Sequence, residues 1–589
     1  MNRLAIHFSA FLSVLIPTVS SVAVMGCSAD SELFGSLNVG LSSASAHGGI
    51  GGFCGDAARR REGATARVFD RARTSAAALS TFLRAMPKGA DLHTHLSGAA
   101  STESLIRWAR QDGLCIRTSD TSAVLPPCTA DTLPIGAATG TGELARTLLQ
   151  SWSMETHTGS LRDRHQHFFD AFGKFSLVAN NHLLEMTDEV VRRAAAQGAV
   201  HMEIIVGFQG SHIGRLADQL MDKSATWTDD YLEQAREQLL QAPEFRPTIL
   251  RSVEEISKLS SELRARWRCD SPQADPACEV SVRYVVHAVR TQSREHVFGQ
   301  WVYAFELAQA DARVVGVNLV APEENPLSLS HYDDEMLALG FLNRLNRTEP
   351  NRQPVHISLH AGELVPEILP AGEAGQVHLR SHIRRAITVA GAERIGHAVD
   401  ILHEIDSDTK DDEDGAASDG GRPLADPLSS SKRSLLRQMA QQGVTVEVCL
   451  TSNQAILGSE GDGHPLPTYL AAGVPVTLAT DDEGILRTDL TGEYLRAAQV
   501  QHLDYRQLKA IARTGVEKSF LPGASLWENA SAMVPVAACA SSDPTAVPAA
   551  WSPACQAFLA QSQRAAQQWK LERKLAAFEA AQTRAIAVP

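Results

Sequence analysis

Short runs of apolar and β-branched residues alternate along the chain with longer stretches whose apolar positions recur at helical spacing. Strands that alternate with helices indicate a parallel sheet. Eight strand–helix units predict a closed (β/α)₈ barrel, an α/β fold. The predicted strands are 90–96, 199–206, 280–289, 313–320, 355–361, 393–397, 444–449 and 474–480.

Two insertions interrupt this alternation. Residues 110–165 follow the first predicted strand, carry two cysteines and include a stretch rich in Pro, Gly and Thr, which predicts a cap. Residues 405–432 are acidic and poor in apolar residues, which predicts a solvated loop. With the helical pattern that ends the chain, residues 56–589 are predicted to form one barrel domain with extra helices.

The beginning of the chain has the pattern of an export signal. Arg3 precedes an apolar run, and the Gly26-Cys27 pair resembles a bacterial lipoprotein processing site, at which Cys27 becomes lipidated. The alternative is a simple secretory signal that is cleaved near the same place. We therefore predict a signal peptide at 1–27, a flexible tether at 28–55, and a mature protein that is periplasmic, anchored in the membrane by lipid, or secreted.

The cysteines agree with an oxidising compartment. The chain has nine, and eight remain when Cys27 is counted as the processed one. Cys449 lies in an apolar strand pattern and is predicted to be a buried free thiol, and Cys54 is also left over. Three pairs that lie close in sequence are the predicted disulfides: Cys115 with Cys128, Cys269 with Cys278, and Cys539 with Cys555.

Composition narrows the class of partner. The 589 residues are 44% hydrophobic and 21% charged, with a formal net charge of −14. A surface this acidic repels phosphate backbones, which argues against nucleic acid as a partner. A small neutral substrate is expected instead, and the sequence leaves the oligomeric state open.

Chemically capable residues gather where four of the predicted strands end. In a barrel these ends share the face that carries active sites. A single histidine on a strand is more often structural than a ligand, but four coincident stretches favour one common site. The residues are His93 and His95 at the end of the first strand, His360 and Glu363 at the end of the fifth, His397 at the end of the sixth, and Asp481 and Asp482 at the end of the eighth.

Imidazoles and a carboxylate at one face are suitable ligands for zinc. A bound ion would lower the pKa of water from about 15.7 to roughly 7 and provide a nucleophile at neutral pH. Glu363 could then carry a proton to or from a substrate. His397 could take a proton from the water or stabilise the developing charge, and Asp482 would face the substrate.

Five stretches, in order between residues 86 and 500, resemble the adenosine deaminase family: "MPKGADLHTHLSG", "HISLHAGE", "ERIGHAVD", "EVCLTSNQAI" and "TLATDDEG". The first stretch, together with the cysteine-bearing insertion, is most similar to the secreted, growth-factor-type branch. The resemblance implies a zinc-dependent (β/α)₈ hydrolase that converts adenosine, and with it 2′-deoxyadenosine, to inosine and ammonia.

The same resemblance implies a role for each residue of the site. Glu363 would donate a proton to purine N1, His397 would orient and deprotonate the attacking water, and Asp482 would hydrogen-bond to N7. Because N1 and N7 are acceptors, Glu363 and Asp482 must hold protons, and burial beside negative charge should raise their pKa values. The ligands of one zinc ion per chain would be His93, His95, His360 and Asp481.

Two positions of the substrate site depart from the family pattern. Ser97 stands where the family commonly has an acidic residue that contacts the ribose 5′ hydroxyl. Ala321 stands where the family usually has a glycine whose backbone N–H meets purine N3, and Pro322 should restrict Ala321 to extended geometry. Gly362, within "HAGE", is also predicted to contact the substrate.

Two alternative functions stay open. The first is a deaminase of adenine or of another adenosine derivative, because Ser97 leaves the sugar end of the substrate undefined. The second is a nucleoside-binding lipoprotein that has lost turnover. The presence of all the implied metal ligands and catalytic groups argues against the second.

Overall fold

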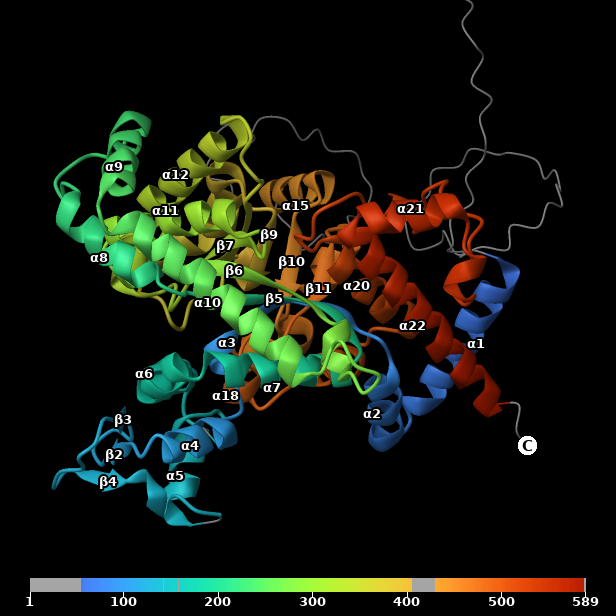
Figure 1. Ribbon diagram of the computed structural model, residues 1–589, viewed down its shortest axis with the longest axis horizontal. Helices are drawn as coiled ribbons and strands as arrows, with labels where there is room; N and C mark the ends of the chain where they lie inside the picture. Colours follow the sequence, from blue (N-terminus) through green and yellow to red (C-terminus); the bar gives the residue numbers. More distant parts are fainter. Residues whose placement is uncertain (1–54, 141, 157, 405–429, 587–589) are drawn as a thin grey trace, which may run out of the picture.

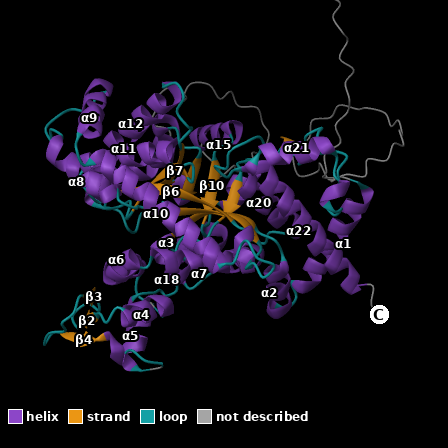
Figure 2. Cartoon of the chain, in the orientation of Figure 1, coloured by secondary structure: helices purple, strands orange, loops and turns teal. Residues whose placement is uncertain are grey.

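The computed structural model describes residues 55–586 except 141, 157 and 405–429. One sheet of eight parallel strands lies at its centre, surrounded by helices (Figure 2). A parallel bridge between Thr94, in the first strand, and Asp481, just after the last strand, joins the two edges of the sheet. The sheet therefore closes into a (β/α)₈ barrel. In sheet order the strands are β1 (Gly89–His95), β5 (Ala199–Val206), β6 (Ser281–Val289), β7 (Val314–Val320), β8 (His356–Ala361), β9 (Arg394–His397), β10 (Thr445–Val448) and β11 (Val476–Leu478).

The barrel fold and all eight predicted strands are confirmed, each end lying within two residues of its prediction. The strands were recognisable because helices cover the sheet, so both faces of a strand are apolar. Every residue of β7 is buried, for example. A helix that is buried nearly all round has apolar residues on all of its sides, with only a few polar ones between them. Such a helix is α11, which packs against α8, β6 and β7 (Figure 1).

The helices occupy the connections between strands and both ends of the described chain. Near the two ends, α1 packs against α22 (Figure 1). The helices are α1 (Asp56–Ala72), α2 (Ala76–Ala85), α3 (Leu96–Ala99), α4 (Thr102–Gln111), α5 (Glu143–Ser151), α6 (Leu161–Asn181), α7 (Leu183–Ala196), α8 (Gly210–Leu220), α9 (Asp229–Gln241), α10 (Phe245–Arg266), α11 (Arg294–Ala310), α12 (Pro326–Thr348), α13 (Glu373–Gln376), α14 (His382–Arg385), α15 (Ser430–Gln442), α16 (Leu450–Leu457), α17 (Leu466–Ala471), α18 (Glu483–Leu486), α19 (Leu490–Gln499), α20 (Tyr505–Glu517), α21 (Pro553–Gln561) and α22 (Gln563–Ile586).

The segment predicted as a cap, 110–165, contains a small antiparallel sheet and lies to one side of the barrel (Figure 1). Its central strand is β2 (Cys115–Arg117), between β3 (Ala123–Val124) and β4 (Thr132–Pro134). The chain then returns to the barrel through α6, which packs against α16. A second small antiparallel pair, β12 (Trp527–Asn529) with β13 (Val534–Pro535), precedes α21.

The three predicted disulfides are present, and Cys449 is a buried free thiol, as predicted. Cys27 and Cys54 lie outside the described residues, as do the predicted signal peptide, the tether up to residue 54, and most of the loop predicted at 405–432. Within the described part of the chain, no helix combines the length and apolar character needed to cross a bilayer.

A buried arginine and an aromatic ring close the end of the barrel where the strands begin. Arg394 Nη2 lies 2.5 Å from Glu203 Oε2, and its Nε lies 2.5 Å from Glu447 Oε1. The Arg394 guanidinium also lies 3.6 Å from the centre of the Phe520 ring, against which His356 stacks. These charges are buried but paired, which is the condition under which buried charges are tolerated.

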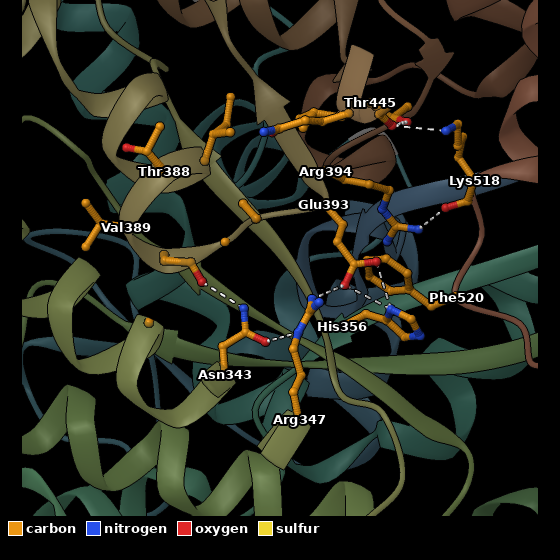
Figure 3. A pocket seen from close by; sticks show the side chains of 18 of the residues that line it. Asn343, Arg347, His356, Thr388, Val389, Glu393, Arg394, Thr445, Lys518 and Phe520 are labelled. Carbon is orange, nitrogen blue, oxygen red and sulfur yellow. Dashed lines mark hydrogen bonds and ion pairs between the residues drawn. The ribbon is translucent and has the colours of Figure 1, made fainter. Parts of the chain in front are cut away.

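A cavity of about 580 Å³ lies next to this closure, among the residues shown in Figure 3. Its lining includes His356, Arg394 and Thr445, which are the first residues of β8, β9 and β10. His360 and His397 lie at the opposite ends of β8 and β9. This cavity is therefore separate from the predicted catalytic face.

Candidate metal centre

Three imidazoles and one carboxylate converge where β1, β8 and β11 end. His360 Nε2 lies 3.0 Å from His93 Nε2 and 3.1 Å from His95 Nε2. Asp481 Oδ1 lies 3.5 Å from the first of these histidines and 3.4 Å from the second. Ligands about 2.0–2.1 Å from a tetrahedral ion are separated from one another by about 3.3 Å. These four separations thus fit ligands around one ion.

Hydrogen bonds behind two of the rings determine which nitrogens face this centre. Asn318 Oδ1 accepts the backbone N–H groups of Leu319 and His360, so the atom is an oxygen and His360 Nδ1, at 2.8 Å, must donate to it. His93 Nδ1 donates to Glu447 Oε2 at 2.7 Å. A neutral imidazole has one proton, so both Nε2 atoms direct lone pairs at each other. A positive charge, either a proton or an ion, is needed between them.

The pKa values of the cluster agree with this need. Burial opposes charge on His93, but hydrogen bonds with Asp481 and Glu447 outweigh burial and raise the pKa of His93 to about 10. Burial lowers the pKa of His95 to about 3 and that of His360 well below its usual value. His95 and His360 thus keep their lone pairs, and only the proton on His93 would have to leave when an ion binds.

The fourth group is an ionised carboxylate. Burial works against charge on Asp481, but the hydrogen bond from His93 and the neighbouring imidazoles lower the pKa of Asp481 below its usual value. Three imidazoles with one carboxylate form a donor set that suits zinc. The residues present therefore fit the ion that the sequence predicted.

The backbone at the strand ends holds these ligands together. The backbone N–H of His95 donates to the Asp481 carbonyl, and the Asp481 N–H donates to the His93 carbonyl, both at 2.9 Å. Asp481 and His397 both have positive φ angles, of 58° and 64°. Non-glycine residues in this region carry backbone strain, which is often found at functional sites.

Two glycines in the recognised motifs are required by close packing against site side chains. A Cβ atom on Gly396 would lie 2.5 Å from His93 Cε1. A Cβ atom on Gly98 would lie 1.7 Å from Asp482 Oδ1. The glycines of "HLSG" and "RIGH" thus give space to a predicted ligand and to a predicted substrate contact.

Glu363 and His397 lie side by side next to the four ligand atoms. Glu363 Oε1 is 3.5 Å from His397 Nε2, and both side chains are buried. A ring nitrogen of His397 lies within 4.8 Å of the ligand atoms of His93, His360 and Asp481. Burial lowers the pKa of His397 to about 4. At neutral pH this ring is uncharged.

Two further carboxyl groups of the site have raised pKa values. Burial and the nearby charge of Asp481 raise the pKa of Glu363 well above its usual value. The same two causes raise the pKa of Asp482 well above its usual value. These directions match the expectation that both groups donate hydrogen bonds.

Glu323 holds the "HAGE" turn in place. Its two carboxylate oxygens accept the backbone N–H groups of Gly362 and Glu363, at 3.1 and 2.9 Å. His382 Nδ1 lies 2.5 Å from Glu323 Oε1, and Arg290 lies 3.7 Å from Oε2. Gly362, predicted to contact the substrate, has φ of +73° and an N–H that Glu323 already occupies. Its evident role in this structure is to form the turn.

Ala321 and Ser97, which depart from the family pattern, lie near the site in different conformations. Ala321 has a φ angle of +83°, so the prediction that Pro322 keeps Ala321 extended was wrong. The surrounding fold overrides the local preference, and Arg290 Nε donates to the Ala321 carbonyl at 2.7 Å. Ser97 lies in α3, just after His95, and is partly buried.

Several residues that support the site were not identified from the sequence. Two of them are polar groups inside apolar strands, and that contrast was the available signal: Glu447 in "TVEV" and Asn318 in "VNLV". Their partners are distant in sequence, so the contacts could not be inferred. These supporting residues are Asn318, Glu447, Asn453 and His464, while Glu323 resembled a family residue in the sequence but received no role there.

Together the fold and the site define a (β/α)₈ barrel with a candidate metal centre at the carboxyl ends of its strands. The family model for adenosine deaminase matches residues 269–528. This part of the chain belongs to the adenosine deaminase family.

Two relatives illustrate the similarity. An aminodeoxyfutalosine deaminase of Streptomyces coelicolor is 43% identical over 94 residues, which cover 16% of this chain and 24% of the relative. An adenosine deaminase of Escherichia coli is 31% identical over 183 residues, which cover 31% of this chain and 42% of the relative. The chain thus spans less than half the length of these curated relatives.

Solved structures of similar proteins cover more of the chain at lower identity. An adenine deaminase from Arthrobacter aurescens covers 74% of this chain and 94% of its own, with 17% identity and a TM-score of 0.43. An Arabidopsis N6-mAMP deaminase covers 75% and 96%, with 19% identity and a TM-score of 0.43. Because these scores are low, the barrel is assigned here from its strand order and closing bridge.

Proposed function

We propose that this protein is a zinc-dependent hydrolase that deaminates adenosine, and with it 2′-deoxyadenosine, to inosine and ammonia. The observation that carries the proposal is the convergence of three imidazoles and Asp481, with four separations of 3.0–3.5 Å between their ligand atoms, next to two carboxyl groups whose pKa values are raised. The match of residues 269–528 to the adenosine deaminase family model supports the same reaction.

The side chains can bind and polarise a purine. Protonated Glu363 would donate to N1, which makes C6 more open to attack, and protonated Asp482 would donate to N7. A bound zinc ion would supply a water molecule of lowered pKa at this position. After attack C6 would be tetrahedral. The amino group would take up the proton that the attacking water lost and leave as ammonia, while the proton of the new C6 hydroxyl returns to Glu363.

The sugar end of the substrate is the less defined part of the proposal. Ser97 offers a hydroxyl where the family commonly has a carboxylate, and a neutral hydrogen bond to the ribose is weaker than a charged one. Relatives and neighbours are named as deaminases of aminodeoxyfutalosine, adenine and N6-mAMP. Deamination of adenine or of another adenosine derivative is therefore the second candidate.

A substrate panel with metal analysis tests the proposal. The purified protein should contain about one zinc per chain, and it should release ammonia from adenosine faster than from adenine or 5′-substituted adenosines. Glu363→Gln should lose most of kcat while it still binds adenosine. Asn346→Asp is a control, because Asn346 is a buried asparagine outside the site. No ammonia from any member of the panel, with zinc bound, would contradict the proposal.

Export is part of the same proposal. It is supported by the signal-like pattern at 1–27 and by three disulfides, which form in oxidising compartments. We further propose lipidation of Cys27 and membership of the secreted, growth-factor-type branch. Fractionation of cells that express the wild type or Cys27→Ser tests the anchor, since only the wild type should stay with membranes.

A further inference from the structure

A line of hydrogen bonds runs behind His397 to a backbone amide. His397 Nδ1 lies 2.9 Å from Asn453 Nδ2, and Asn453 Oδ1 lies 3.0 Å from His464 Nε2. The backbone N–H of Leu466 donates to His464 Nδ1 at 3.1 Å. The three side chains are buried, so water does not compete for these bonds.

Leu466 determines the direction of every bond in this line. A backbone N–H can only donate, so His464 Nδ1 has a lone pair and the proton of this ring is on Nε2. That proton needs an acceptor, so Asn453 directs its oxygen to His464 and its NH₂ group to His397. His397 Nδ1 must therefore accept a hydrogen bond, and it cannot carry a proton.

A His397 ring with no proton on Nδ1 is neutral and has its proton on Nε2. That nitrogen is buried and makes no hydrogen bond among the described residues. It faces the site, because Glu363 Oε1 is 3.5 Å away. A protonated Nε2 can donate a hydrogen bond to an attacking oxygen, but it has no lone pair with which to remove a proton from it.

We infer that His397 acts as a hydrogen-bond donor to the attacking oxygen and not as its base, and that Asn453 and His464 are positioning residues that set this tautomer. The inference rests on the proposed function for the identity of the attacking oxygen. It replaces the sequence-based expectation that His397 deprotonates the water. The sequence showed a histidine at the right strand end, but its tautomer depends on partners 56 residues and more along the chain.

Neutron diffraction from crystals of the full chain as purified, exchanged into D₂O, tests the tautomer directly. Deuterium should be found on Nε2 of His397 and on Nε2 of His464, with none on either Nδ1. Deuterium on Nδ1 of His397, alone or together with Nε2, would overturn the inference. This measurement does not depend on turnover, so it stays decisive even when the proposed deaminase activity is not found.

The substitution Asn453→Asp gives opposite expectations for a donor and for a base. A carboxylate at position 453 would accept hydrogen bonds from both His464 and His397. The His397 proton would then lie on Nδ1, and Nε2 would be left without a proton. Loss of one preorganised donor to a developing charge costs about 10²–10³-fold in kcat, and KM should change little. A base would gain from the same change, so an unchanged or increased kcat would overturn the inference.

The matched control is Asn346→Asp, which places a carboxylate at another buried asparagine. Asn346 Oδ1 accepts hydrogen bonds from Gln309 and Arg352, and a carboxylate keeps both while it loses the long bond from Asn346 Nδ2 to the Gln353 carbonyl. This variant should keep the wild-type kcat. His464→Gln is the conservative partner variant, because an amide group can still donate to Asn453 Oδ1, and it should keep more of kcat than His464→Glu. Equal loss in the two His464 variants would also overturn the inference.

Discussion

Glu447 Oε2 lies 2.7 Å from His93 Nδ1, on the opposite side of the imidazole from the nitrogen that faces the metal centre. Burial works against charge on Glu447, but Arg394 and the hydrogen bond from His93 lower the pKa of Glu447. An ionised carboxylate behind a ligand histidine orients the ring and makes its other nitrogen a stronger ligand. Glu447 thus links the closed end of the barrel to the metal centre.

The substitution Glu447→Gln should weaken zinc binding by about 10–100-fold, because a neutral amide supports the His93 ring less well. Competition with a chromophoric chelator measures this affinity. Added zinc should restore most of the activity, since the catalytic groups are unchanged.

The control for this experiment is Glu203→Gln, which removes the other carboxylate partner of Arg394. Glu203 Oε2 lies 2.5 Å from Arg394 but contacts no predicted ligand. The variant should be less stable than the wild type and should bind zinc with wild-type affinity. Equal zinc affinity in Glu447→Gln and Glu203→Gln would contradict the role assigned to Glu447.

Gly98 is expected to tolerate no side chain. A Cβ atom at this position would lie 1.7 Å from Asp482 Oδ1, so Gly98→Ala must displace Asp482. We expect kcat/KM for adenosine to fall at least about 10-fold, in line with the cost of misplacing a positioned group. The control is Gly173→Ala, in α6, where a Cβ atom meets nothing within 4 Å. A Gly98→Ala enzyme with wild-type kinetics would show that Asp482 does not contact the substrate.

Much of the fold could be predicted because its signals are local. Strands buried on both faces are rich in apolar residues, and this pattern made the eight strands recognisable. Cysteine pairs separated by 9 to 16 residues were also paired correctly. The alternation of side chains on a strand placed His93 and His95 together.

The supporting contacts could not be predicted because they join distant parts of the chain. Glu447 meets His93 across 354 residues, and nothing near either residue indicates the other. At Ala321 a local rule failed, because the preference set by Pro322 is weaker than the tertiary contacts that hold φ at +83°. The tautomer of His397 depends on a chain of partners and has no signal in its own motif.

Glu335, in α12, is expected to make stability depend on pH. Burial raises its pKa to about 8, and neither carboxylate oxygen has a hydrogen-bond partner among the described residues. Between about pH 4.5, its ordinary pKa, and pH 8, the folded protein holds a proton that the unfolded chain has lost. Because the unfolded chain binds fewer protons than the folded protein in this range, the free energy of unfolding falls as the pH rises from about 4.5 to about 8.

The variant Glu335→Gln removes the titration and keeps the shape of the side chain. Its melting temperature should exceed that of the wild type by a margin that grows from pH 5 to pH 8. Differential scanning calorimetry of both proteins across this range measures the margin. A margin that stays constant with pH would show that Glu335 does not titrate with folding.

The backbone of Ala321 is in a strained conformation that glycine would adopt without strain. Its φ angle of +83° lies in the region where a Cβ atom is strained, by roughly 1–2 kcal/mol for an L-residue. Part of the gain from glycine is lost because glycine makes the unfolded chain more flexible. Ala321→Gly should therefore increase the free energy of unfolding by about 0.5–1 kcal/mol. Urea denaturation measures this difference, and Asn351→Gly is the comparison, because Asn351 has φ of +65° but asparagine tolerates this region better. If Asn351→Gly gained as much stability as Ala321→Gly, the gain at position 321 could not be attributed to relief of strain at the alanine Cβ atom.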